Sequence, residues 1–501
     1  MKITVGSTKA GNLSTDVLVA AVYGKGGRRS AVFRAVNAAI GGGLGSLLEL
    51  TGWSGKAGEV VAIPAPKGLR ARLLVVGSLG DRGAGSTAAL HRLMNSAAIA
   101  ARPAKASRVA VHLDSAMDPR AGLDAAMATA IGTGWSFGRY AFDAHLAKKA
   151  EIAPLEELFL YFEGRKDRPV LASALERGFV IGAAQARARN LVNEPANIIN
   201  PVSIAEYCKD LAEQSGLEIT VLGQEECEAR NMGAYLAVSR GTRFPPQFIH
   251  MVHKPAGATR RVALVGKALT FDSGGLCLKP AAGQATMKMD MGGSAAVIGT
   301  MAAVAALDLP IEVHGICAAT ENMTGEDAYR TGDVLTASNG KTIEVLNTDA
   351  EGRLTLADAL HYAAALEPEA IVDLATLTGA CLVALGPDIA AVMGTGRGLM
   401  RDLRSAADTT GEPLWELPMP AHYRELLSSK VADMSNLGGR WGGAITAGLF
   451  LKEFVPEGIP WAHLDIAGPC FVDKPLSGQQ YGATGFGVRL LTEWLSELSR
   501  S

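Results

Sequence analysis

Two blocks of alternating strand-like and helical segments dominate this chain, and a long helical stretch separates them. The apolar, strand-like runs of the first block lie at 16–23, 59–63, 73–77, 109–113 and 158–162. Those of the second block lie at 262–265, 312–318, 342–346, 371–374 and 390–393. Short apolar strands with helices between them favour a largely parallel sheet that is covered on both faces. The pattern therefore predicts an α/β fold, with a mostly parallel, helix-covered sheet in the second block.

The stretch between the blocks, 171–191, is rich in Ala and Arg and is predicted to form one helix. Asn193-Glu194-Pro195-Ala196-Asn197 ends it, because proline fixes φ and disfavours helix in the residue before it. A chain of 501 residues also exceeds the roughly 250 to 300 residues that one core organises. We expect a smaller N-terminal α/β domain at 1–170, an interdomain helix at 171–192 and a larger C-terminal domain at 193–501.

Charge and cysteine usage exclude several classes of protein. A formal charge of -2 gives no general attraction for phosphate backbones or anionic membranes. The N-terminal residues 1–6 lack the layout of a signal peptide, and the six cysteines form no C-x-x-C pair, so we expect reduced thiols in a cytosolic protein. Residues 291–307 carry no charge but fall short of the roughly 20 residues of a membrane span, and are expected to form a buried helix.

Charged residues gather where predicted strands end. Lys267, Asp272 and Lys279 follow the run at 262–265, and Asp290 precedes the uncharged helix. Asp349, Glu351 and Arg353 follow the run at 342–346. In an open α/β sheet, ligands bind beyond the carboxyl ends of the strands. These side chains are therefore expected to meet in one site.

Four converging carboxylates need cations, because unpaired they would repel one another and lose hydration. Two divalent ions would balance their formal charge, and hard oxygen ligands suit Mg, Mn or Zn. Paired metals commonly activate a water and clamp a transition state. Lys267 could join such a site only as a neutral amine, since a nearby cation and burial both favour loss of its proton.

Each residue alone has a simpler interpretation. Asp290 could be an N-cap, and Asp349 and Glu351 could only complement a helix dipole. A single lysine is usually solvated, and Arg353 could be a salt-bridge partner. Their joint occurrence after three strand ends favours the site.

The run Asn347-Thr348-Asp349-Ala350-Glu351-Gly352-Arg353-Leu354 resembles the signature of the leucyl aminopeptidase family, also called cytosol aminopeptidases. The family also carries a lysine, then an aspartate five residues on, a lysine twelve on and an aspartate twenty-three on; Lys267, Asp272, Lys279 and Asp290 have this spacing. The segments 193–197 and 461–468 are similar to the family too. The likeness is strong from about residue 180 onward and weak before it.

The resemblance implies a two-metal aminopeptidase that removes leucine or other apolar residues from peptide N-termini by a metal-activated water. It implies two Mn or Zn ions per subunit, whose ligands would be Lys267, Asp272, Asp290 and Glu351 for one ion, and Asp272, Asp349 and Glu351 for the other. Lys279 would polarise the scissile carbonyl, and Arg353 would hold a bicarbonate-like anion that takes a proton from the water. A metal would also capture the free α-amine, which would make the enzyme an exopeptidase.

The side-chain pocket of the family maps onto Met287, Thr376, Gly379, Ala467 and, less directly, Cys470. Ala268 stands where many members have glycine, which removes no ligand. By resemblance, the chain is also expected to form a homohexamer in the cytoplasm.

Two other functions remain open. A two-metal phosphoesterase would use the same carboxylates, with Lys279 and Arg353 on the phosphate. Some bacterial members of the family also bind DNA, although the net charge here gives such a secondary role little support. The chain has no His-Glu-x-x-His and no Gly-x-Ser-x-Gly motif, which disfavours a thermolysin-like site and a serine hydrolase.

Overall fold

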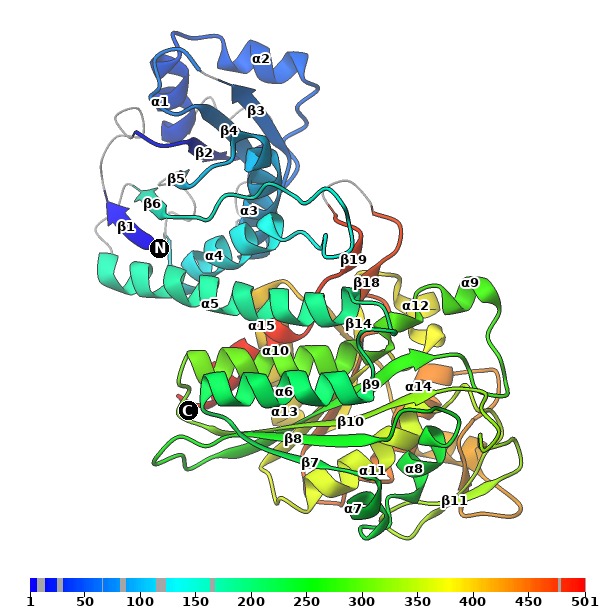
Figure 1. The fold of residues 1–501 in the computed structure, drawn as a ribbon. Coiled ribbons are helices and arrows are strands. Elements are labelled where there is room, and N and C mark those ends of the chain that lie inside the picture. The colour runs from blue at the N-terminus through cyan, green and yellow to red at the C-terminus, as the bar shows by residue number, and fades with distance from the viewer. Residues whose placement is uncertain are drawn as a thin grey trace. The chain divides into compact units, whose positions relative to one another are not determined.

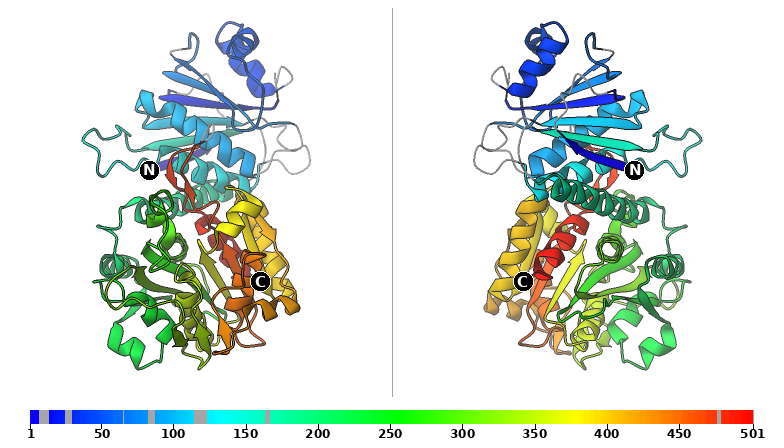
Figure 2. Two further views of the ribbon diagram at one scale, coloured as in Figure 1. Left: turned by 90° about the vertical axis from the view of Figure 1, so that its right-hand side faces the viewer. Right: turned by 90° about the vertical axis from the view of Figure 1, so that its left-hand side faces the viewer.

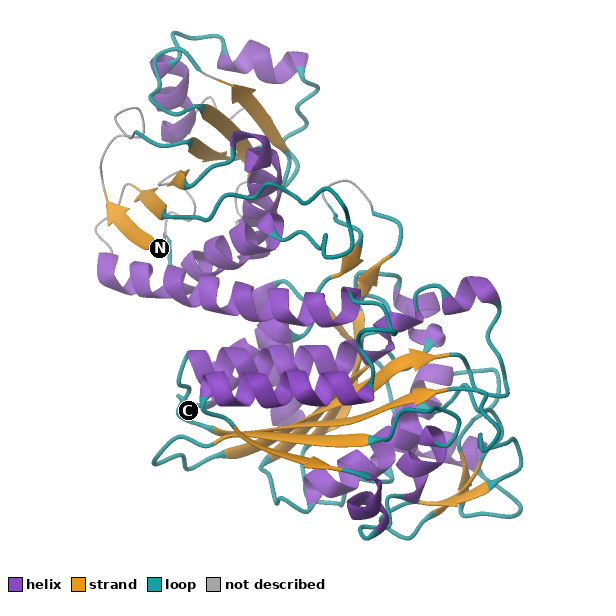
Figure 3. Ribbon diagram, in the orientation of Figure 1, coloured by secondary structure: helices purple, strands orange, loops and turns teal. Residues whose placement is uncertain are grey.

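The computed structural model describes residues 1–6, 14–24, 30–64, 66–81, 87–113, 123–162, 167–475 and 479–500 (Figures 1 and 3). The chain divides into two compact units. Unit 1 contains Met1–Ala183 and Thr409–Gly411, and unit 2 contains Ala184–Asp408 and Glu412–Ser501. The division at 183/184 falls inside one long helix, α5 (Arg168–Asn193), at the place where the sequence predicted a helix between domains.

Unit 1 is built on a six-stranded sheet with the order β1-β6-β5-β2-β4-β3. All neighbouring strands are parallel except β3 and β4. The strands are β1 (Lys2–Gly6), β2 (Val17–Val22), β3 (Val60–Pro64), β4 (Leu73–Ser78), β5 (Arg108–Leu113) and β6 (Glu157–Phe162). The sequence predicted all of them except β1.

Helices cover both faces of this sheet, as Figure 2 shows. One hydrophobic cluster joins it to α1 (Ala31–Ala39) and α2 (Leu44–Leu50). A second cluster joins the other face to α3 (Thr87–Ala101), α4 (Ala125–Arg139) and the start of α5, with a short 3-10 turn, η2 (Arg102–Ala104), after α3. Unit 1 thus has its own core on each side of its sheet.

Unit 2 contains an eight-stranded sheet with the order β15-β14-β17-β13-β9-β10-β8-β7. Its four central strands run parallel, while β8 and β14 run antiparallel to them. The strands are β7 (Glu218–Leu222), β8 (Gln247–His253), β9 (Arg261–Asp272), β10 (Glu312–Asn322), β13 (Ala370–Ala375), β14 (Ala390–Thr395), β15 (Leu414–Glu416) and β17 (Trp461–Asp465). The predicted, mostly parallel sheet is confirmed.

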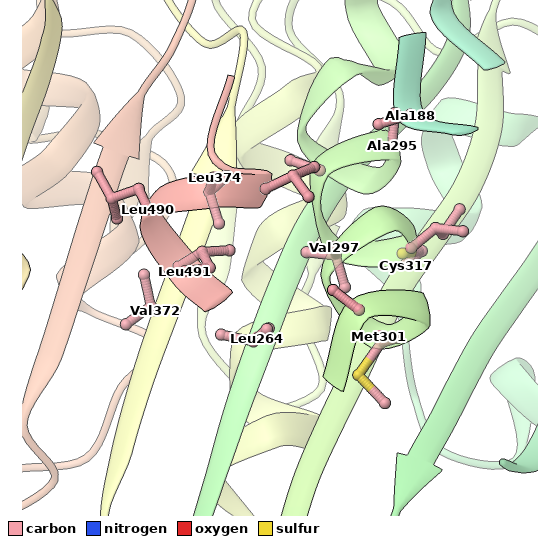
Figure 4. Close-up of a cluster of buried hydrophobic side chains, with 14 of the residues drawn as sticks. Ala188, Leu264, Ala295, Val297, Met301, Cys317, Val372, Leu374, Leu490 and Leu491 are labelled. Atoms are coloured by element: carbon pink, nitrogen blue, oxygen red, sulfur yellow. The ribbon is translucent and has the colours of Figure 1, made fainter. Parts of the chain in front are cut away.

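The central strands of the eight-stranded sheet are buried on both faces of the sheet because helices cover each face (Figure 1). One face carries α6 (Pro201–Ser215), α10 (Gly292–Ala306), α13 (Arg397–Thr410) and α15 (Val488–Leu498). The other carries α7 (Gln224–Glu228), α8 (Gly233–Ser239), α11 (Gly352–Ala364) and α14 (Gly443–Lys452). Figure 4 shows the first face, where Leu264, Val372 and Leu374 of the sheet lie near Leu490 and Leu491 of α15.

Helix α10 is the uncharged stretch of the sequence, and its residues from Gly292 to Val304 are buried. Together with the preceding 3-10 turn η3 (Met287–Met291), it is long and apolar enough to cross a membrane by composition alone, but 78% of that window is buried within the fold. A Cβ on Gly293 would stand 2.0 Å from the carbonyl oxygen of Leu374. Its small residues therefore let α10 lie directly on the sheet, as a core helix does.

The predicted strand at 342–346 is shorter than expected and lies outside the main sheet. β12 (Thr342–Glu344) pairs with β11 (Val334–Thr336) and β16 (Met434–Ser435) in a three-stranded sheet. Asn339 and Gly340, whose φ is 84°, make the turn that folds β12 back on β11. The remaining elements are α9 (Ala281–Gln284), α12 (Gly379–Leu385), η4 (Ala421–Leu427), β18 (Phe471–Val472) and β19 (Gly482–Ala483).

Candidate metal centre

Six charged side chains from three segments of unit 2 meet at the carboxyl end of the central strands. β9 carries Lys267 and ends at Asp272, and the loop after it carries Lys279. η3 carries Asp290, and the segment from β12 to α11 carries Asp349 and Glu351. The sequence predicted this convergence, although β12 reaches the site from the small sheet.

Lys267 of β9 contacts a carboxylate from each of the other two segments. Its Nζ lies 2.7 Å from Asp290 and 2.9 Å from Glu351, and it donates to the carbonyl oxygen of Thr376 at 3.1 Å. Burial acts to lower the pKa of Lys267, but the carboxylates of Asp290, Glu351 and Asp272 outweigh it and hold the pKa above its usual value. With only protein groups around it, the Lys267 side chain is a charged ammonium. The neutral amine expected from the sequence would therefore require a bound cation that displaces the ammonium proton.

Lys279 is the second cation of the site. Its Nζ lies 2.8 Å from Asp272 Oδ2 and 2.5 Å from Asp349 Oδ1. Burial lowers its pKa, and the carboxylates of Asp272 and Glu351 raise it above the usual value. Its side chain is less buried than that of Lys267, with 18% of the side-chain surface exposed against 3%. Lys279 is therefore the lysine that an entering molecule can reach.

Oxygen atoms of Asp272, Asp290 and Glu351 lie within 4.8 Å of one another, and all three residues are buried. Burial raises the pKa of Glu351 to about 8, that of Asp290 to about 6, and that of Asp349 above its usual value. If all four carboxylates are ionised, their negative charge exceeds the charge of the two ammonium groups by two. Buried Glu351 Oε2 has no hydrogen-bond partner among the described residues. This set of hard oxygen donors fits divalent cations.

Asp290 is not the predicted N-cap, and Glu351 does more than stand at the start of a helix. The N-cap of α10 is Met291, and Asp290 Oδ1 instead accepts hydrogen bonds from Lys267 Nζ and Thr376 Oγ1, the latter at 2.8 Å. Glu351 is the N-cap of α11 but makes no side-chain capping bond. Both side chains face the site.

Two residues that hold the site together were missed from sequence. Asn322 Nδ2, at the end of β10, donates to Asp272 Oδ1 and to the carbonyl oxygen of Thr348, both at 2.9 Å. Tyr329 Oη donates to the same carbonyl at 2.7 Å. No spacing in the sequence distinguishes these two, because their role depends on the approach of β10 to the segment after β12.

Arg353 lies in the first turn of α11 and is buried, with 6% of its surface exposed. Its Nη1 donates to the carbonyl oxygen of Asn436 at 2.8 Å, while Nε has no hydrogen-bond partner among the described residues. Burial lowers the pKa of Arg353 to about 10, against the opposing effect of Glu351 and Asp465. Arg353 is thus a buried cation with a donor available for an anion.

The predicted pocket residues follow the ends of β13 and β17 or lie in η3. Thr376 contacts Asp290 and Lys267, as described above. A Cβ on Gly292 would stand 2.2 Å from Cys470 Sγ and 3.5 Å from Thr376 Cγ2, so these two side chains flank Gly292. Met287 opens η3, Ala467 follows β17, and Gly379 begins α12 with open space around its Cβ position.

Residues 186–492 match the model of the cytosol aminopeptidase family, catalytic domain, and residues 19–149 match that of the N-terminal domain of the same family. The chain belongs to the cytosol aminopeptidase family. The resemblance predicted from residues 347–354 is confirmed, and with it the α/β fold of two domains.

Two relatives in the cytosol aminopeptidase family align with almost the whole length of this chain. It is 46% identical over 448 residues to a probable cytosol aminopeptidase of Synechococcus sp. (strain JA-2-3B'a(2-13)), covering 89% of this chain and 87% of the relative. It is 45% identical over 463 residues to a probable cytosol aminopeptidase of Microcystis aeruginosa, covering 92% of each. Hydrolysis at peptide N-termini is the activity of this family.

Two solved structures have the same fold as this chain over nearly its whole length. A mutant of tomato leucine aminopeptidase superposes with a TM-score of 0.88 and 38% identity, and the match covers 99% of this chain and 96% of that structure. The bottromycin maturation enzyme BotP in complex with Mn superposes at 0.84, with 34% identity, covering 97% of this chain and 100% of its own.

Proposed function

We propose that this aminopeptidase works with two divalent metal ions, Mn or Zn, held by the carboxylate cluster. The first would be bound by Lys267, Asp272, Asp290 and Glu351, and the second by Asp272, Asp349 and Glu351. The observation that carries the proposal is the approach of Asp272, Asp290 and Glu351 within 4.8 Å, with an unpartnered buried oxygen on Glu351. The Mn in the BotP structure supports the choice of ion.

Bound there, the metal ions would supply an activated water and a binding place for the free α-amine of a peptide. Lys279 is the residue that would meet the scissile carbonyl oxygen, because it is the more exposed of the two lysines. It would stabilise the negative charge that develops on that oxygen. When the metal ions are bound, Asp272 and Asp349 would bind the ions instead of Lys279.

Arg353 would hold the bicarbonate-like anion that accepts the proton of the water. Its buried Nε without a partner supports this role, since a buried donor is costly until it meets an acceptor. The anion would be bound without any change in the Arg353–Asn436 hydrogen bond, which uses Nη1.

The preferred first residue would be leucine or another apolar residue, received by Met287, Thr376, Gly379 and Ala467 with Cys470 beside them. The open space at Gly379 and the half-buried positions of Met287 and Ala467 support this assignment. We further propose a cytoplasmic homohexamer. The six cysteines are all free, in keeping with a reducing compartment.

The proposal is tested with leucine p-nitroanilide and p-nitrophenyl phosphate in the presence of added Mn or Zn. We expect hydrolysis of the anilide that a chelator abolishes, and no hydrolysis of the phosphate. Cleavage of the phosphate alone would instead support the two-metal phosphoesterase. A gel-shift titration across salt concentrations would detect a DNA-binding role through its steep salt dependence.

A further inference from the structure

The segment Trp461–Gly468 has the family's sequence pattern, yet most of it takes no part in the cluster of charged residues. Its Asp465 is fully buried and is the last residue of β17, opposite Ala375 at the end of β13. The loops that leave these two strand ends are the two that carry the proposed pocket residues Thr376, Gly379 and Ala467. Asp465 therefore lies at the base of both loops.

Both oxygens of Asp465 accept hydrogen bonds from these loops. Oδ1 accepts from the backbone N–H groups of Leu377 and Ala467, each at 3.2 Å, and from that of Thr378 at 3.4 Å. Oδ2 accepts from Thr378 Oγ1 at 2.6 Å. Thr378 Oγ1 also accepts from the N–H of Cys381 at 3.0 Å, which caps α12. One carboxylate thus connects the loop after β13 with the loop after β17.

The loop after β13 is anchored at a second point, by Thr376 at the cluster of charged residues. Thr376 Oγ1 donates to Asp290 Oδ1 at 2.8 Å, and the carbonyl oxygen of Thr376 accepts from Lys267 Nζ at 3.1 Å. The loop after β13 is therefore held at two points, by Thr376 at the charged cluster and by Thr378 at Asp465.

We propose that Asp465 is a positioning residue that sets the first-residue preference of the enzyme, because it holds the two walls of the pocket at a fixed separation. This inference rests on the proposed function. Asp465 makes no hydrogen bond with the six residues of the charged cluster, although its charge acts to raise the pKa of Arg353. Without its carboxylate, three N–H groups and a hydroxyl lose their acceptor, and the loops can move apart. A leucyl side chain needs both walls, whereas a glycyl residue needs neither.

Thr378 offers the mildest test, since Asp465 itself is fully buried and its removal could prevent folding. Thr378→Val removes the hydroxyl at nearly constant volume, and Thr378→Ser keeps it, which makes the serine variant the matched control. Asp465→Asn adds a variant that keeps the shape and one acceptor oxygen. For each purified full-length variant, kcat and KM are measured with leucine and glycine p-nitroanilides, together with bound metal and the melting temperature.

We expect Thr378→Val to lower kcat/KM for the leucyl substrate about tenfold, the loss typical of one hydrogen bond to a charged group. For the glycyl substrate we expect kcat/KM to fall about twofold or less, and we expect the bound metal to stay unchanged. Asp465→Asn should reduce the leucine-to-glycine ratio in the same direction, and Thr378→Ser should preserve it. Equal losses for both substrates, an unchanged ratio, or loss of bound metal in Thr378→Val would each overturn the inference. A wild-type enzyme that cleaves neither substrate would instead contradict the proposed function itself, and the inference with it.

Discussion

At the scale of single residues, the site depends on how carboxylates and cations are matched. Lys267, Asp272, Lys279 and Asp290 could be singled out from the sequence because their spacing matches the pattern of the family. The sequence did not predict which lysine pairs with which carboxylate, since these pairs form between side chains of different segments. Asn322 and Tyr329 escaped prediction for the same reason.

Lys279 is expected to act on the reaction and not on metal binding. The substitution Lys279→Met keeps much of the side-chain volume and removes the charge that, by our proposal, would face the scissile carbonyl oxygen. We expect kcat to fall on the order of 100-fold while bound metal stays at the wild-type level, as for other losses of an oxyanion donor. The exposed Lys430→Ala serves as the control and should leave kcat unchanged. A Lys279→Met enzyme with wild-type kcat would rule out this role.

At the scale of elements, β8 and β10 are joined by a chain of buried side chains at the opposite end of β10 from the site. His250 Nε2 lies 2.9 Å from His314 Nδ1, and His314 Nε2 lies 2.9 Å from Glu312 Oε1. His250 Nδ1 lies 3.1 Å from Tyr362 Oη. Since a carboxylate only accepts, His314 donates to Glu312 and His250 donates to His314, with both rings neutral. The sequence predicted β10 but not β8, so this chain could not be predicted.

Because it contains buried His250, this hydrogen-bonded series of side chains makes the free energy of unfolding depend on pH. Burial, and then His314, lower the pKa of His250 from 6.5 to about 4, so the unfolded state binds the proton more readily. The stability contributed by neutral His250 is therefore complete above pH 6.5 and is lost as the pH falls toward 4. Between pH 7.5 and 5.5 the loss amounts to about 1 kcal/mol.

The measurement is the melting temperature of wild type and His250→Gln at these two pH values. We expect the wild type to lose more of its melting temperature on acidification than His250→Gln does, because the variant cannot take up this proton. His422→Gln, which alters an exposed histidine, should behave as wild type. Equal acid losses in wild type and His250→Gln would show that His250 does not govern this effect.

At the scale of the whole molecule, alternation of strands and helices was enough to predict two α/β units and the long helix that links them in sequence. It did not predict that the two strands flanking the parallel centre of the sheet, β8 and β14, run antiparallel to their neighbours, because tertiary contacts and not apolar patterning decide this direction. It also placed 342–346 in the main sheet, since a short apolar run carries no sign of which sheet it joins. The units of the structure divide at 183/184.

We propose above that the carboxylates of unit 2 hold two metal ions and that the aminopeptidase activity depends on these ions. The most direct measurement is the metal content per chain, by elemental analysis, alongside leucine p-nitroanilide hydrolysis. We predict two ions in the wild type, one in Asp349→Ala, and a fall in kcat/KM on the order of 100-fold or more in that variant. The exposed Asp210→Ala should match the wild type in both measurements. An Asp349→Ala enzyme that keeps two metal ions and full activity would contradict the account.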